Sequence, residues 1–115
     1  MNFENAVSVI TGAGSGIGRE LALLLAKRKS NVVITDINPE GLKETEALLA
    51  DAGVTVKSAI LDVADKAAFE SLASEVEAEM GPANAIFNNA GVALDGKVGE
   101  MQREHFEWIV NINFW

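Results

Sequence analysis

Short runs of β-branched residues alternate with longer stretches of helical periodicity, and this alternation constrains the fold more than any other feature of the sequence. Strands that alternate with helices pair in parallel through right-handed crossovers, and the helices cover both faces of one sheet. Parallel strands are buried on both sides and therefore form continuous apolar runs. The expected strands are residues 6–11, 31–36, 54–61 and 85–87.

Helix signals follow each expected strand. The first helix is predicted to bury one face, made of Ile17, Leu21, Leu24 and Leu25. The later helices begin at Asn38-Pro39, at the capping residue Asp65 and near Gln102, and the last of them is expected to continue through Trp115.

This pattern predicts an α/β fold, a doubly wound parallel sheet of the Rossmann type. We expect about four strands and four helices in one domain over residues 1–115. A chain of 115 residues is long enough for one domain and too short for two.

Composition excludes several classes of function. A net charge of −8 argues against a nucleic-acid partner, which requires a basic surface. The absence of cysteine removes disulfides and thiolate chemistry, and the single histidine, His105, has no histidine or cysteine partner for a metal. Neither a signal peptide nor an apolar run of membrane-spanning length is visible, so a soluble, cytoplasmic protein without a membrane partner is expected.

A glycine-rich turn joins the first expected strand to the first helix. Its sequence, Thr-Gly-Ala-Gly-Ser-Gly-Ile-Gly at residues 11–18, has the spacing T-G-x-x-x-G-x-G. Glycine lets the backbone turn tightly and approach a ligand closely, and a helix N-terminus presents N–H groups and a positive dipole end to a pyrophosphate. In this strand-to-helix context the turn predicts a dinucleotide site rather than a turn that merely needs positive φ.

Asp36 ends the second expected strand, about 20 residues past the turn, where an acidic side chain can bind the ribose hydroxyls of an adenosine. A carboxylate at this point also repels a 2′-phosphate. Neither Ile37 nor Ser15 is basic, so NAD is favoured over NADP as the cofactor. The alternative is that Asp36 only forms the turn at the strand end.

Four motifs in order resemble the short-chain dehydrogenase/reductase family, and the resemblance covers essentially the whole chain. Residues 11–18 are similar to the family's glycine turn, and Asp62-Val63 resembles its adenine-contacting pair. Residues 88–91 match its N-N-A-G motif, and Asn113 fits its catalytic asparagine. The resemblance implies the following cofactor-binding residues: Gly12, Ser15, Gly16, Ile17, Gly18, Asp36, Asp62, Val63, Asn89, Ala90 and Gly91.

Asn113 and Asn111 are both candidates for the catalytic position, and Asn113 is the predicted one. Asn113 lies at helical spacing from Phe106, Ile109 and Val110, which would place an amide on an otherwise apolar face. Asn88 is interpreted as tying neighbouring strands together rather than as touching the cofactor. The predicted helix is apolar on a second side as well, and that side would contact either a later part of the same chain or another subunit of a homo-oligomer.

The resemblance implies hydride transfer between a nicotinamide and an alcohol or ketone, with a tyrosine, a lysine and a serine completing the site. The sequence contains no tyrosine. We therefore expect a C-terminally truncated chain that supplies the cofactor half-site and is itself inactive, with the fourth strand as an exposed edge. Two alternatives are a non-enzymatic dinucleotide-binding module and a methyltransferase that binds S-adenosylmethionine.

Overall fold

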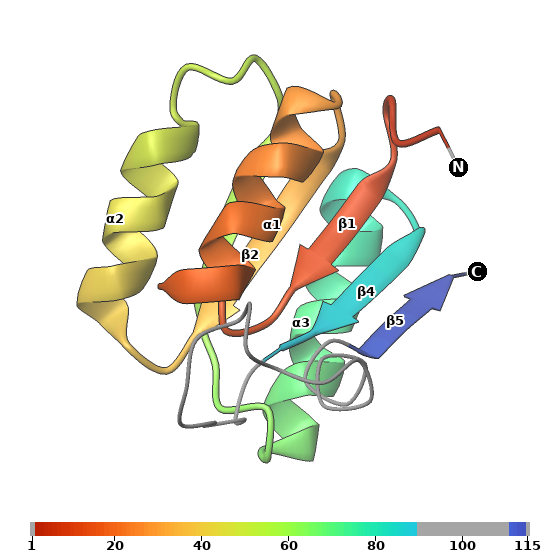
Figure 1. Ribbon diagram of the computed structural model, residues 1–115. Coiled ribbons are helices and arrows are strands. Elements are labelled where there is room, and N and C mark those ends of the chain that lie inside the picture. The colour runs from red at the N-terminus through yellow and green to blue at the C-terminus, as the bar shows by residue number, and fades with distance from the viewer. Residues whose placement is uncertain (1, 90–110, 115) are drawn as a thin grey trace.

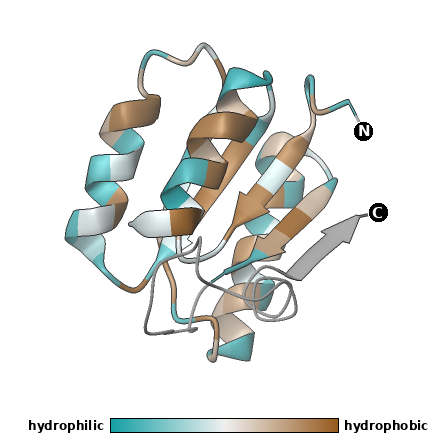
Figure 2. Ribbon diagram, viewed as in Figure 1, coloured by the Kyte–Doolittle hydropathy of each residue, from teal (hydrophilic) through white to brown (hydrophobic). Residues whose placement is uncertain are grey.

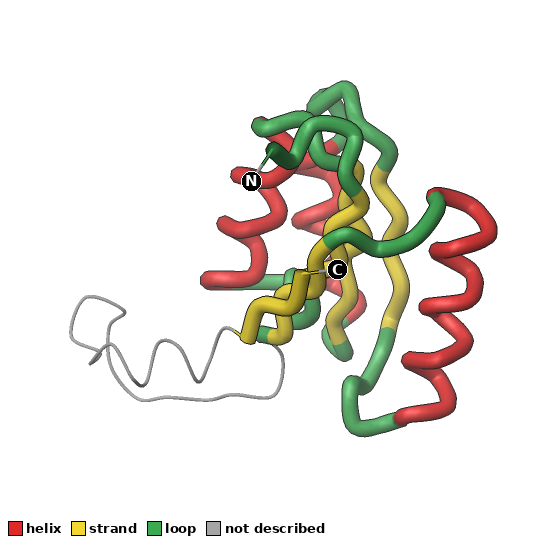
Figure 3. The backbone as a smooth tube through the Cα atoms, turned by 90° about the vertical axis from the view of Figure 1, so that its right-hand side faces the viewer, coloured by secondary structure: helices red, strands yellow, loops and turns green. Residues whose placement is uncertain are grey.

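A computed structural model describes residues 2–89 and 111–114. They contain a five-stranded sheet with the strand order β3-β2-β1-β4-β5. Helices α1 and α2 cover one face of the sheet and α3 covers the other (Figures 1 and 3). The elements are β1 Val7–Ile10, α1 Gly16–Lys27, β2 Asn31–Asp36, α2 Pro39–Leu49, β3 Val56–Ile60, α3 Lys66–Met80, β4 Ala85–Asn88 and β5 Asn111–Phe114. Strands β1 to β4 pair in parallel, which confirms the doubly wound Rossmann arrangement.

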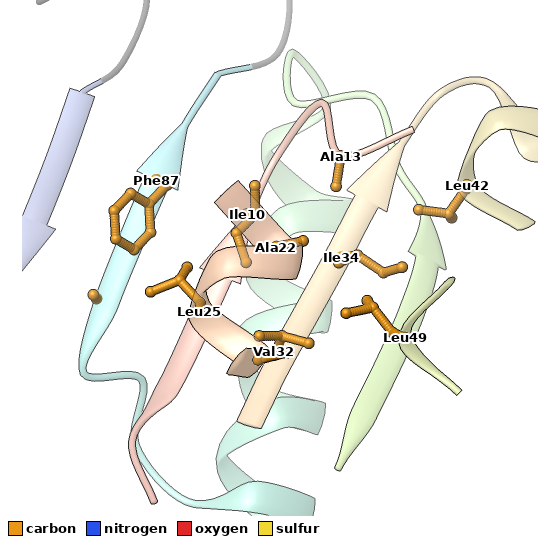
Figure 4. Packing of buried hydrophobic residues seen from close by; sticks show 11 residues of the cluster. Ile10, Ala13, Ala22, Leu25, Val32, Ile34, Leu42, Leu49 and Phe87 are labelled. Carbon is orange, nitrogen blue, oxygen red and sulfur yellow. The ribbon is translucent and has the colours of Figure 1, made fainter. Parts of the chain in front are cut away.

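The core consists of two apolar layers separated by the sheet. Successive strand residues point to opposite faces. In β2, Val32 and Ile34 pack toward α1 and α2, whereas Val33 packs toward α3. All three are fully buried, which explains why the strand is a continuous apolar run rather than an alternating one. Figure 4 shows the larger layer, and Figure 2 shows how apolar residues concentrate in the strands.

Helix α1 approaches the sheet through smaller residues than the sequence predicts. Its buried residues are Gly18, Ala22, Leu25 and Ala26, whereas Leu24 is 49% exposed. The expected face is therefore wrong at Leu24. Because glycine and alanine carry little or no side chain, they allow the helix axis to come close to the sheet, and the buried face is centred on them.

The other two helices begin at the predicted caps. The Asn38 side chain accepts hydrogen bonds from the backbone of Glu40 at 3.1 Å and of Gly41 at 3.3 Å. The Asp65 side chain accepts one from the backbone of Ala68 at 3.0 Å. These bonds satisfy donors that the first turn of a helix leaves without a partner. No helix in the described ranges combines the length and apolarity of a membrane span.

The end of the chain contradicts the predicted fourth helix over the part that the structure describes. Residues Asn111–Phe114 form β5, which pairs antiparallel with β4 and places Asn113 opposite Ile86. The four residues alternate polar and apolar, a period that suits a strand, and the pairing satisfies backbone groups that β4 would otherwise expose. The expected exposed edge at β4 is therefore wrong, and residues 102–110 of the predicted helix lie outside the described residues.

Strand β3 forms the opposite edge of the sheet and carries Lys57. The Lys57 ammonium lies 2.9 Å from a carboxylate oxygen of Glu79 and 3.6 Å from one of Glu75, both on α3. The hydrogen bond with Glu79 is the main cause that raises the pKa of Lys57 above its ordinary value. Both glutamates remain largely exposed, and a lysine on an edge strand discourages pairing with another chain.

Replacing Ile34 by alanine tests the core between β2 and the helices α1 and α2. Ile34 is fully buried, so Ile34→Ala should lower the free energy of unfolding by about 2–5 kcal/mol through lost burial and a residual cavity. Leu48→Ala is the control, because Leu48 is 58% exposed, and should cost under about 1 kcal/mol. Urea denaturation measures both values, and equal costs would contradict this core.

Candidate functional site

The parallel pairing of β1, β2 and β4 brings their carboxyl ends to one edge of the sheet. The glycine turn follows β1, Asp36 is the last residue of β2, and Asn89 follows β4. Ligands of open α/β sheets bind outside this edge, near the point where the strand order reverses. Here β1 lies between β2 and β4, so the turn after β1 is at that reversal (Figure 1).

The backbone of the turn has a shape that requires glycine at particular positions. Gly12 has a φ of 64° and Gly16 a φ of 53°, values that L-residues rarely adopt. A Cβ on Gly18 would lie 2.1 Å from the carbonyl oxygen of Gly12. The start of α1 therefore packs directly against the first glycine of the turn, and any side chain at residue 18 would separate them.

The N-terminus of α1 has features that suit an anion. Its cap residue Ser15 is exposed and makes no side-chain cap hydrogen bond, and the first turn contains no acidic residue. A Cβ built on Gly16 would meet no atom of the described residues within 4 Å. The N–H groups of a first helical turn and the positive end of the helix dipole fit a pyrophosphate.

Asp36 lies beside the turn, and its carboxylate is fixed by two backbone donors. Gly14 N donates to Oδ2 at 2.8 Å and Asn38 N donates to Oδ1 at 2.9 Å. A Cβ on Gly14 would come within 2.7 Å of the same Oδ2, so glycine is needed here for a close approach. Each carboxylate oxygen keeps acceptor capacity for a further donor, such as a ribose hydroxyl.

Asn89 holds the turn from the other side. Its backbone N–H donates to Thr11 Oγ1 at 2.8 Å, and its side-chain Nδ2 donates to the carbonyl of Gly12 at 3.3 Å. The family resemblance implies that Asn89 lies along the cofactor, and it assigns no role to Thr11. In the structure both residues tie the end of β4 to the glycine turn.

The remaining predicted residues lie as follows. Ile17, half-buried, packs against the core layer under α1. Asp62 and Val63 follow β3 at the same edge, with Asp62 exposed and Val63 half-buried. Ala90 and Gly91 lie outside the described residues. Asn113 lies in strand β5 and not on a helical face, which corrects the prediction of a helix there, and its catalytic role stays a prediction based on the family spacing.

Sequence reasoning missed Arg19 and Thr45, which contact the turn from α1 and α2. The Arg19 guanidinium donates to the carbonyl of Gly14, and Thr45 Oγ1 donates to the carbonyl of Ala13 at 2.7 Å. Arg19 could have been noticed in the sequence, because it stands in the first turn of the helix that follows the glycine turn. The pattern gives no comparable signal for Thr45, because its contact depends on how α2 packs.

These features define a Rossmann-type α/β fold with a glycine-rich turn at the switch point of its sheet. The family described as short chain dehydrogenase matches residues 6–115, and the chain belongs to that family. The match agrees with the resemblance of the glycine turn and of residues 88–91.

Individual relatives agree with the assignment. SadH of Mycobacterium tuberculosis, which is named as an oxidoreductase, is 41% identical over 114 residues, which are 99% of this chain and 41% of that protein. Estradiol 17-beta-dehydrogenase 11 of Pongo abelii is 37% identical over 113 residues, or 95% of this chain and 38% of that protein. The chain thus spans about two fifths of the length of these relatives.

The fold is similar to a short chain dehydrogenase/reductase from Burkholderia phymatum, solved in complex with NAD. The TM-score is 0.77 at 34% identity, and the similarity covers 95% of this chain and 39% of that one.

The close approach of Gly18 to Gly12 can be tested by adding one methyl group. Gly18→Ala should lower the free energy of unfolding by about 1–3 kcal/mol, since the new Cβ overlaps a backbone oxygen that cannot rotate away. Glu20→Ala, at an exposed position of the same helix, should change stability by about 0.5 kcal/mol or less. Thermal or urea unfolding distinguishes the two, and a neutral Gly18→Ala would contradict the packing of the turn.

Proposed function

We propose that the chain forms the cofactor half-site of an NAD-dependent oxidoreductase of the short-chain dehydrogenase type. The parent reaction would be hydride transfer between the nicotinamide and an alcohol or ketone substrate. The observation that carries the proposal is the contact between the glycine turn and Asp36, which places an open helix N-terminus beside a fixed carboxylate. A helix N-terminus can bind a pyrophosphate, and a carboxylate can accept hydrogen bonds from the hydroxyls of an adenosine ribose.

Preference for NAD over NADP follows from the charge at Asp36. The carboxylate would accept hydrogen bonds from the ribose hydroxyls and would repel a phosphate at the 2′ position. The adjacent Ile37 is 67% exposed and offers no positive charge to balance such a phosphate. The solved relative from Burkholderia phymatum, which is in complex with NAD, supports this preference.

The dinucleotide, when bound, supplies the redox chemistry, and the residues of this chain bind and orient it. Gly12, Gly16 and Gly18 have no side chain that could crowd a bound pyrophosphate, and α1 would direct its N-terminus at the phosphates. General acid–base catalysis requires a titrating group within hydrogen-bond reach of the reacting oxygen. The sequence has no tyrosine for the role that the family gives to that residue, so we propose that the proton-transfer step needs groups outside these 115 residues.

Removal of the Asp36 carboxylate tests the ribose assignment. Asp36→Ala should weaken NAD binding by roughly 10-fold or more, the value of one to two charge-assisted hydrogen bonds, and should weaken NADP binding much less. Asp51→Ala, at an exposed carboxylate beyond the far end of α2, is the matched control and should leave both affinities unchanged. Calorimetric titration measures all four values, and equal losses for NAD and NADP in Asp36→Ala would refute the assignment.

We expect the 115-residue chain to bind cofactor without turning over substrate. Incubation of the purified chain with NAD and a panel of primary and secondary alcohols should yield no NADH above a protein-free blank. The chain's own NAD binding serves as the positive control for folding. Reproducible NADH formation would show that the chain contains its own acid–base group.

A further inference from the structure

The Arg19 side chain does not extend into solvent but forms hydrogen bonds with the glycine turn and with helix α2. Its side chain is only 23% exposed. Nε donates to Thr45 Oγ1 at 2.9 Å, and Nη2 donates to the Gly41 carbonyl at 3.1 Å as well as to the Gly14 carbonyl. Nη2 also lies 3.0 Å from Glu44 Oε2, but Glu44 is 68% exposed, so water screens that ion pair. The buried acceptors therefore dominate the contacts of Arg19.

Thr45 connects Arg19 to the glycine turn. Its Oγ1 is fully buried and accepts from Arg19 Nε, which leaves its single hydrogen for an acceptor. The nearest acceptor is the Ala13 carbonyl at 2.7 Å, and the Gly41 carbonyl lies at 3.2 Å. The hydroxyl is thus directed at the turn.

The Ala13 carbonyl and the Gly14 N–H belong to one peptide group, and that N–H donates to Asp36 Oδ2 at 2.8 Å. An unbroken chain of hydrogen bonds therefore runs from Arg19 through Thr45 and this peptide group to the Asp36 carboxylate. Each bond in such a chain polarises the next, and the planar peptide transmits any tilt of its carbonyl to its N–H.

The start of α2 packs against the turn next to this peptide. A Cβ on Gly41 would lie 2.6 Å from the carbonyl oxygen of Gly14, which belongs to the adjacent 14–15 peptide. Arg19 donates to that same carbonyl, while Thr45 donates to the Ala13 carbonyl, so the two side chains hold the peptides on either side of Gly14. Loss of either contact would release a restraint on the Gly14 N–H that orients Asp36.

We propose that Arg19 and Thr45 are positioning residues for recognition of the adenosine ribose, acting through the 13–14 peptide on Asp36. This inference rests on the proposed function, in which Asp36 binds the ribose hydroxyls. Arg19 and Thr45 do not themselves touch the ribose. They determine where the Asp36 carboxylate lies, and so how strongly the site discriminates by the 2′-hydroxyl.

The test compares NAD with the analogue that lacks the 2′-hydroxyl of the adenosine ribose, using calorimetric titration of the full chain. The wild type should bind NAD about tenfold more tightly than the deoxy analogue, as expected for one charge-assisted hydrogen bond. Thr45→Val removes the hydroxyl at nearly constant volume, and Arg19→Met removes the guanidinium but keeps an apolar stem. Both should reduce that ratio to about twofold or less, while affinity for the deoxy analogue changes by less than about twofold.

Glu44→Gln is the control, since it removes the exposed ion pair and leaves the relay intact, and its ratio should match the wild type. Circular dichroism confirms that each variant is folded, and Arg19→Lys should restore part of the ratio because its ammonium can reach one of the acceptors.

Several outcomes overturn the inference. If Thr45→Val and Arg19→Met weaken both ligands equally, or if neither variant folds, the two residues only hold α1 and α2 together. If Glu44→Gln lowers the ratio as much, the ion pair is responsible rather than the relay. If the wild type binds NAD and the deoxy analogue equally, Asp36 does not bind the ribose 2′-hydroxyl, and the proposed function loses its main support. If the wild type shows the tenfold ratio and both variants keep it, only the relay through Arg19 and Thr45 is refuted.

Discussion

Parallel pairing of β1 with β2 on one side and β4 on the other is the constraint on which the site depends. It places the carboxyl ends of three strands at one edge, so that residues distant in sequence meet there. The pairing is stable because both faces of these strands are covered, by α1 and α2 on one side and by α3 on the other. Burial of the strands and assembly of the site are thus two results of one arrangement.

Close backbone packing converts that strand edge into a site of defined shape. The turn contacts α1 at Gly18, α2 at Gly41 and the carboxylate of Asp36, and at each point a Cβ would come within 2.8 Å of a neighbouring atom. Glycine at these positions therefore allows neighbouring segments to approach closely, in addition to allowing unusual backbone conformations. The result is a helix N-terminus and a carboxylate held in fixed relation, which is what a molecule with a pyrophosphate next to a ribose would need.

The sequence predicts correctly those elements that depend on residues within a few positions of one another. The bounds of β2 and the Asn38 cap agree with the structure, because a β-branched run and an Asn-Pro pair act within a few residues. The errors arise where packing decides. Leu24 is exposed because small residues centre the buried face elsewhere, and Asn113 fits a helical and an alternating pattern equally well until β4 offers a partner. The glycine turn and Asp36 could be predicted from their spacing, but the role of Arg19 depends on the approach of α2.

An amide-resolved NMR titration of the isotope-labelled chain with NAD would locate the dinucleotide site on the fold. If the glycine turn and Asp36 form that site, saturable shifts should appear at the amides of residues 12–18, at Asn38 beside the Asp36 carboxylate and at Asn89, with the amides of α3 unaffected. Saturable shifts centred on α3, or no shifts while the spectrum shows a folded chain, would contradict the claim that the turn and Asp36 form the dinucleotide site.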